Sequence, residues 1–145
     1  KLGIDLPVMG KPVANYVKYV QTGKLIYLSG HGPKDEKGQD MVGKVGDGVS
    51  IQQGYDAARA CGIQLLSSLK DATGGDLKKV KRIVKVLGMV NCTTGFTDQP
   101  KVMNGFSDLM VAVFGEKGKH ARSAVGMHAL PNNIIVEIEM IVEVE

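Results

Sequence analysis

The spacing of apolar and polar residues predicts a long amphipathic helix in the first half of the chain. Apolar or small residues recur every three or four positions from Ile51 to Leu69, which is the spacing of one face of an α-helix. Ser50 and Gln53 form the capping-box pattern that begins helices, and a Thr-Gly-Gly sequence at 73–75 is a typical helix end. We expect this helix to bury its apolar stripe in the core.

A second amphipathic helix is predicted in the second half of the chain. Thr97 or Asp98 can cap it, Pro100 is tolerated in its first turn, and Gly115 ends it. Its apolar stripe consists of Val102, Phe106, Leu109 and Val113. Each helix has one apolar face, so each must pack against another element.

Segments with strand character surround the two helices. Turn residues lie at 21–23 and 130–133, and a loop rich in glycine and charge occupies 31–48, with one short strand expected near 41–45. The longer predicted strands are 14–20, 24–29, 82–91, 121–129 and 134–144. This order of elements indicates an α+β fold, a mixed β-sheet with two α-helices packed on one face. A chain of 145 residues fits a single domain, 1–145.

The final strand alternates strictly between carboxylates and apolar residues. Odd positions from Glu137 to Glu145 carry four glutamates, and every even position from Val136 to Val144 is apolar. Side chains in a strand alternate between the two faces of the sheet, so the carboxylates share one face. The apolar face is expected to pack on the helices.

A hairpin between the last two strands is expected to place an arginine beside these carboxylates. If Ala129 pairs with Ile134 across the final turn, Arg122 lies on the carboxylate face, because paired residues share a face. Its neighbours there, Ala124 and Gly126, are small and leave room for a ligand. The alternative interpretation is a solvated acidic face with an ordinary surface ion pair.

The carboxylate face also carries apolar residues, which favours its being covered. Ile135 and Ile141 lie at odd positions of the same strand. A sheet face of mixed character is most simply covered by another copy of the chain, so a homo-oligomer is expected.

Composition excludes several classes of function. The formal charge of +3 is mild and does not call for a polyanionic partner, and the basic segment 78–85 contains no aromatic residue for base stacking, so no nucleic acid is expected. Two cysteines are too few for a disulfide framework or a cysteine-only metal site. Cys61 is expected in the core, and Cys92 has no activating base near it in the sequence. No apolar run reaches the roughly 18 residues that a membrane span needs.

The histidines and the glycine-rich loop give weaker signals. His31 follows Ser29 closely and is interpreted either as a ligand contact or as a surface loop residue, whereas His120 and His128 are expected to be polar surface or turn groups. No pair of them has helical metal-ligand spacing, so no metal is expected. The loop 43–48 lacks the Gly-Lys-Ser/Thr ending of a phosphate loop and is interpreted as a flexible turn.

Several motifs in order resemble the Rid/YjgF family of reactive-intermediate deaminases. The closing segment, His-Ala-Arg-Ser-Ala-Val at 120–125 followed by Leu-Pro at 130–131 and an alternating Glu-Ile-Glu strand at 136–141, resembles the family's signature. Three earlier segments also resemble family motifs: Asn-Tyr-Val at 15–17, Leu-Ser-Gly-His-Gly-Pro at 28–33 and Val-Met-Asn at 102–104.

This resemblance implies a fold, an assembly and an activity. The family has a chorismate-mutase-like α+β unit that assembles into homotrimers, with ligand pockets between subunits. Its characterised members hydrolyse enamines and imines such as 2-aminoacrylate to 2-oxo acids and ammonia, without a metal or organic cofactor. A cytoplasmic protein acting on a small imino or 2-oxo acid is therefore expected, without nucleic acid or membrane partners.

The resemblance also assigns roles to residues. Arg122 would hold the substrate carboxylate, and Glu137 would orient or activate the attacking water. The residues that would line the pocket are Tyr16, Ser29, Gly30, Asn104 and Ala124.

The chain departs from the family pattern in ways that indicate a longer, divergent branch. Ala124 stands where the family usually has cysteine, and Asn15 replaces the usual proline. The loop 31–48 and the helical region 104–114 are longer than in short members. Two alternatives stay open, a non-catalytic metabolite-binding trimer and an endoribonuclease or translation inhibitor, although the acidic final strand argues against the latter.

Overall fold

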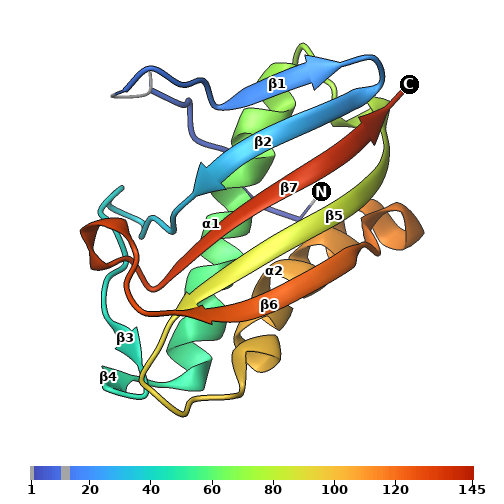
Figure 1. Ribbon diagram of the computed structural model, residues 1–145. Helices are drawn as coiled ribbons and strands as arrows, with labels where there is room; N and C mark the ends of the chain where they lie inside the picture. The colour runs from blue at the N-terminus through green and yellow to red at the C-terminus, as the bar shows by residue number, and fades with distance from the viewer. Residues whose placement is uncertain (1, 11–13) are drawn as a thin grey trace.

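The computed structural model, which describes residues 2–10 and 14–145, has a five-stranded sheet with two α-helices behind it (Figure 1). The strands, in spatial order, are β1 (Tyr19–Thr22), β2 (Leu25–His31), β7 (Val136–Val144), β5 (Val80–Asn91) and β6 (Ala121–Met127). The helices are α1 (Ile51–Ala72) and α2 (Gln99–Phe114). Strands β5 and β6 are parallel and the other neighbours are antiparallel, which confirms the predicted mixed sheet of an α+β fold.

Short elements complete the chain. A two-stranded parallel ladder joins β3 (Lys44–Val45) to β4 (Gly48–Val49), in the region where a short strand was expected. The 3-10 turns are η1 (Leu77–Lys79), η2 (Gly115–Gly118) and η3 (Pro131–Asn133). In η3, Asn132 and Asn133 adopt left-handed backbone conformations with φ of 56° and 58°, which asparagine tolerates better than most residues, so the predicted turn is confirmed.

Helix α1 begins as its sequence predicts, whereas in α2 Asp98 occupies the N-cap position without the expected capping hydrogen bond from its side chain. The Ser50 hydroxyl accepts from the Gln53 amide, and the Gln53 side chain accepts from the Ser50 amide, which is the expected capping box. Cys61 is fully buried in the core between α1 and the sheet. The two helices pack closely at Gly105, where any side chain would overlap the backbone carbonyl of Tyr55.

The first strand is shorter than predicted. Strand β1 begins at Tyr19, so residues 14–18 are not part of the sheet. The pairing of β2 with β7 is irregular between Leu28 and His31, and Ser29 bonds through its amide to Lys18 and through its hydroxyl to Val17. These hydrogen bonds hold Val17 and Lys18, which precede β1, beside β2, although the two segments do not form a regular ladder there.

The predicted hairpin between the last two strands is wrong. Strand β5 lies between β6 and β7, so Arg122 pairs with Val86 of β5, and Val86 pairs in turn with Met140 of β7. The chain leaves β6 at the edge of the sheet and inserts its final strand at the centre, where both strand edges find partners. Because Val86 and Met140 are buried against the helices, Arg122 points toward the helix side.

The other face of the sheet has no helix over it, and Figure 1 shows it toward the viewer. The alternation predicted for the final strand is confirmed, since even positions of β7 are buried and odd positions lie on this open face. The open face also carries Tyr27 and Val125, which are 44 % and 38 % exposed. Among the described residues, no helix has the length and apolar character needed to cross a bilayer.

Candidate functional site

Arg122 lies at the free edge of the sheet, held against α2 by two hydrogen bonds. Its Nη1 donates to Asn104 Oδ1 at 3.0 Å and to Ser107 Oγ at 3.1 Å. The two acceptors are three residues apart, so they lie on the same face of α2 about one turn from each other. Strand β6 and helix α2 together therefore fix one nitrogen of the guanidinium.

The remaining edge of this guanidinium is free to bind an anion. Each Nη carries two hydrogens, and both hydrogens of Nη1 are used by Asn104 and Ser107. Across residues 2–10 and 14–145, neither Nε nor Nη2 has a hydrogen-bond partner, and Arg122 forms no ion pair. An Nε–Nη2 edge presents two parallel N–H groups, the geometry that binds a carboxylate with two hydrogen bonds.

His120 extends this polar cluster and was missed by the sequence prediction, which placed it at the surface. Its ring lies 2.9 Å from Ser107 Oγ through Nε2 and 2.6 Å from the Gly118 carbonyl through Nδ1, and it packs edge-on against Phe106. Burial lowers the pKa of His120 below its usual value; the bond to Gly118 opposes this shift, and the Arg122 charge adds to it. Its position two residues before Arg122, just ahead of β6, was the available signal.

Glu137 belongs to a second cluster, on the open face. Its carboxyl group lies over Gly30, so closely that a side chain at position 30 would overlap it. Burial raises the pKa of Glu137, and the neighbouring charge of Glu139 acts in the same direction. A carboxyl group with a raised pKa can both accept and donate a proton nearer neutral pH, as general acid–base catalysis requires.

Ser29 and Tyr16 lie beside the Glu137 cluster. The Ser29 hydroxyl donates to the Val17 carbonyl at 2.6 Å, which holds the segment preceding β1 next to Gly30. Tyr16 directly precedes Val17, and its side chain is 53 % exposed. The structure thus brings Tyr16, Ser29, Gly30 and Glu137 to one region of the molecule.

The two clusters do not meet within one chain, contrary to the prediction that Arg122 and Glu137 share a face. Arg122 points to the helix side from the edge strand, whereas Glu137 points to the open side from the central strand β7. The prediction failed because it assumed that the last two strands are paired. One protomer therefore presents two separate clusters.

The small residues near Arg122 lie close to other parts of the protein. Ala124 packs against the core from β6. A side chain at Gly126 would come within 2.8 Å of Gln99 Nε2 and Cys92 Sγ, since its Cβ would lie 2.7 and 2.8 Å from these atoms. Gln99 and Cys92 therefore occupy the space directly over Gly126, although this glycine also borders a cavity lined by Thr93 and Met127.

Several other candidate residues have structural surroundings. His31 is buried, with Nε2 2.7 Å from Ser68 Oγ of α1, so it is neither the ligand contact nor the loop residue that the sequence suggested. Cys92 is also buried and receives a weak hydrogen bond from Gln99. In the described portions of the chain, no three His, Cys, Asp or Glu side chains are grouped as metal ligands.

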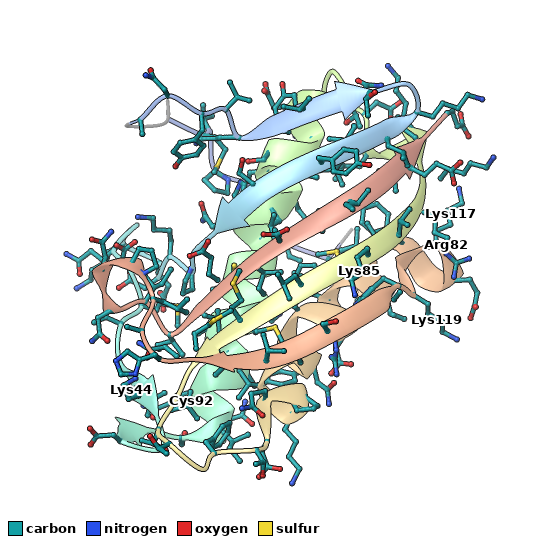
Figure 2. The ribbon with its side chains drawn as sticks, in the orientation of Figure 1. Lys44, Arg82, Lys85, Cys92, Lys117 and Lys119 are labelled. Atoms are coloured by element: carbon teal, nitrogen blue, oxygen red, sulfur yellow. The ribbon has the colours of Figure 1, made fainter. Side chains whose placement is uncertain are left out.

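The basic residues are divided between two places. In Figure 2, Arg82, Lys117 and Lys119 gather at the end of the sheet where β5 begins, and Arg82 donates to the Lys119 carbonyl at 3.1 Å. Lys85 instead stands on the open face and donates to Ser123 Oγ at 3.0 Å. Arg82 and Lys85 of the basic segment therefore lie in different places.

Comparison with known proteins places the chain among relatives of the same length and fold. It is 45% identical over 99% of its length to "Protein TCP17" of Trypanosoma cruzi, 89% of which is covered. It is 30% identical over 98% of its length to a "2-iminobutanoate/2-iminopropanoate deaminase" of Dermatophagoides farinae, 95% of which is covered. The crystal structure of Atu1372 from Agrobacterium tumefaciens, a protein of unknown function, superposes with a TM-score of 0.92 at 42% identity, covering 99% of this chain and 88% of that one.

The family match extends over almost the whole sequence. Residues 1–144 match the family described as "YjgF/chorismate_mutase-like, putative endoribonuclease". The motifs that indicated this family include the β6 edge, the Gly30 region and the final strand, where the two clusters lie. The chain belongs to the YjgF family, with the chorismate-mutase-like fold of two helices packed on a mixed β-sheet.

Proposed function

We propose that this protein is a hydrolytic deaminase of small imino acids and their enamine tautomers, giving a 2-oxo acid and ammonia. The observation that carries the proposal is that the Nε–Nη2 edge of Arg122 has no hydrogen-bond partner among the described residues, while its Nη1 is held by Asn104 and Ser107. A fixed guanidinium with one open edge suits a planar carboxylate. The likeness to the Dermatophagoides farinae protein, named for acting on 2-iminobutanoate and 2-iminopropanoate, supports this substrate class.

The active site forms between copies of the chain. Arg122 and Glu137 lie on opposite faces of one sheet, so a complete site needs the Arg122 cluster of one protomer beside the Glu137 cluster of another. Such a contact joins two different surfaces of neighbouring protomers. Repeated contacts of this kind form a closed ring when the rotation from one protomer to the next divides a full turn evenly. We propose the trimer as that ring, with the open face of each sheet covered by its neighbour.

The chemistry needs only positioning and proton transfer. Arg122 holds the carboxylate of the imino acid, which places the electrophilic imine carbon in a pocket with a water molecule. Glu137 accepts a proton from the water as its oxygen bonds to that carbon, and the imine nitrogen is protonated. With the substrate entering as the protonated imine, the addition leaves a hydroxyl and an amino group on that carbon and one proton on Glu137. Glu137 gives this proton to the amino group and takes the hydroxyl proton as the C–N bond breaks, so that ammonia leaves and the C=O bond of the 2-oxo acid forms.

The test generates 2-aminoacrylate in solution and follows pyruvate release. The wild type is expected to release pyruvate faster than the uncatalysed reaction, and Arg122→Ala is expected to lose this acceleration. Arg122→Lys keeps the charge but not the two parallel N–H groups, so it should retain only part of the activity.

Two other results would replace the proposal. Binding of pyruvate or 2-oxobutyrate by a wild type that accelerates none of several imino acids would identify a metabolite-binding protein. Cleavage of RNA by the wild type, lost in Arg122→Ala, with no acceleration of imine hydrolysis, would identify an endoribonuclease.

A further inference from the structure

A chain of hydrogen bonds connects the backbone of η2 to the guanidinium of Arg122. The Gly118 carbonyl lies 2.6 Å from His120 Nδ1, His120 Nε2 lies 2.9 Å from Ser107 Oγ, and Ser107 Oγ accepts from Arg122 Nη1 at 3.1 Å. The carbonyl belongs to η2, Ser107 to α2 and Arg122 to β6, and His120 lies in the connection between η2 and β6. The His120 and Ser107 side chains thus lie on the side of Arg122 opposite its open edge.

The direction of each hydrogen bond follows from the chemistry of the partners. A carbonyl only accepts, so Nδ1 of His120 carries the hydrogen that is donated to Gly118. In a neutral imidazole the other nitrogen is then an acceptor, and the Ser107 hydroxyl donates to Nε2. The Ser107 oxygen consequently turns a lone pair toward Arg122, and donating its own hydrogen makes this oxygen a better acceptor.

The surroundings of His120 favour this neutral form. The ring packs edge-on against Phe106 of α2, with centroids 5.7 Å apart, and is half-buried. The charged group that faces it is Arg122, since α2 contributes Phe106 and Ser107 and η2 contributes the Gly118 carbonyl. Burial and the Arg122 charge both hold the pKa of His120 below its usual value.

We infer that His120, acting through Ser107, is a positioning residue that fixes the guanidinium of Arg122 in its carboxylate-binding orientation. The inference rests on the proposed function for its purpose, but the hydrogen-bond chain exists without a ligand. If the bond to Ser107 is lost, Nη1 keeps only the bond to Asn104, and the guanidinium can move by rotation about the bonds of the Arg122 side chain. The entropy cost of ordering the side chain would then fall on the binding step, which weakens the affinity of Arg122 for the carboxylate.

The primary test measures the motion of Arg122 by NMR in the assembled, ligand-free protein. Rotation about the Nε–Cζ bond and hydrogen exchange at Nε are compared in the wild type, His120→Ala, Ser107→Ala and the double variant. Each single variant is expected to speed this rotation several-fold. The double variant should be no faster than Ser107→Ala, because both changes interrupt the same chain.

Two matched variants separate positioning from a general loss of packing. His120→Gln places a neutral amide where Nε2 was and can still accept from Ser107, so it should keep Arg122 ordered. Asn104→Ala removes the independent bond to Nη1, and its effect should add to that of His120→Ala. Circular dichroism and the assembly size of each variant confirm that it is folded.

Acidification provides a further readout. As His120 gains a proton, Nε2 becomes a donor and the imidazolium repels the guanidinium, so Arg122 should loosen in the wild type as the His120 resonances titrate. His120→Gln cannot titrate and should show no such change. If the enzyme is active, His120→Ala and Ser107→Ala should each raise KM roughly 3- to 10-fold with little change in kcat, the size expected for one neutral hydrogen bond.

Some results would overturn the inference whatever the activity assay shows. Equal Arg122 mobility in the wild type, His120→Ala and Ser107→Ala would do so, as would effects of the two substitutions that simply add. Absence of imine hydrolysis with the predicted NMR behaviour would instead leave the positioning role standing and reject the proposed function.

Discussion

The carboxyl group of Glu137 occupies the space that a side chain at Gly30 would need. The two residues come from neighbouring strands, β2 and β7, and the absence of a Cβ at position 30 is what lets the carboxyl lie flat against the β2 backbone. Glycine is required here by the close approach rather than by its backbone angles.

Gly30→Ala should therefore displace Glu137 and impair catalysis more than stability. The clash is with the end of a flexible side chain, which can move away at small cost. Loss of a positioned general base typically lowers turnover by about 10²- to 10⁴-fold. Gly10→Ala is the matched control because nothing lies within 4 Å of a Cβ at that position. Steady-state kinetics of both variants measure the effect, and full activity in Gly30→Ala would contradict the role of Glu137.

The raised pKa of Glu137 predicts the acidic limb of the activity profile. A general base works when deprotonated, so kcat/KM should rise as pH increases through a pKa above the usual value of 4.5. Because the charge of Glu139 contributes to this shift, Glu139→Gln should move the limb to lower pH. Glu143→Gln, farther along β7, serves as the control.

The raised pKa of Glu137 also affects the stability of the folded protein. A carboxyl group whose pKa is raised on folding contributes stability below its unfolded pKa and loses that contribution as pH rises through the folded pKa. Glu137→Gln removes the ionisable group, so it should be more stable than the wild type at neutral pH and lose this advantage in acid. Urea denaturation at both pH values measures the difference, and a neutral-pH loss of stability would contradict the assigned burial cost.

A site shared between protomers predicts complementation between two inactive variants. In trimers assembled at random from equal amounts of Arg122→Ala and Glu137→Gln chains, about one quarter of the sites receive both wild-type residues. Pyruvate release should recover to about that fraction of wild type. Mixing Arg122→Ala with Asn104→Ala, which both alter the Arg122 cluster, leaves no site with that cluster intact, so activity should not rise above that of the Asn104→Ala chains alone. If the first mixture stayed inactive while forming mixed trimers, both residues would have to act within one chain.

Gly105 predicts a cost at the contact between the helices. In an exposed helix, replacing glycine by alanine stabilises by roughly 0.5–1 kcal/mol. Here the added Cβ would overlap the Tyr55 carbonyl and approach the Arg59 amide to 3.2 Å, so backbone rather than side chain must move. Gly105→Ala should destabilise by about 1–3 kcal/mol in urea denaturation. A gain in stability would show that α1 and α2 pack less closely than described.

Much of the fold could be predicted from periodicity. The capping box at Ser50 and the apolar stripe through Cys61 predicted α1, and the alternation from Val136 to Val144 predicted which face of β7 is buried. These are local patterns, and the 3.6- and 2-residue periods express them directly. The extent of β1 was overestimated because residues 14–18 have strand-like composition without a regular ladder partner.

The candidate site, like the fold, could be predicted from the sequence only in part. The sequence by itself named the residues that we propose to carry the chemistry, since Arg122, Glu137 and Gly30 all lie in segments that resemble motifs of the family to which the chain belongs. Only the tertiary structure decided on which side of the sheet each one lies, because facing depends on which strands are neighbours and in what register. By placing β5 between β6 and β7, the fold turned Arg122 toward α2 and into contact with Ser107, and through it with His120. Those contacts join residues whose partners depend on packing, and no local period in the sequence encodes them.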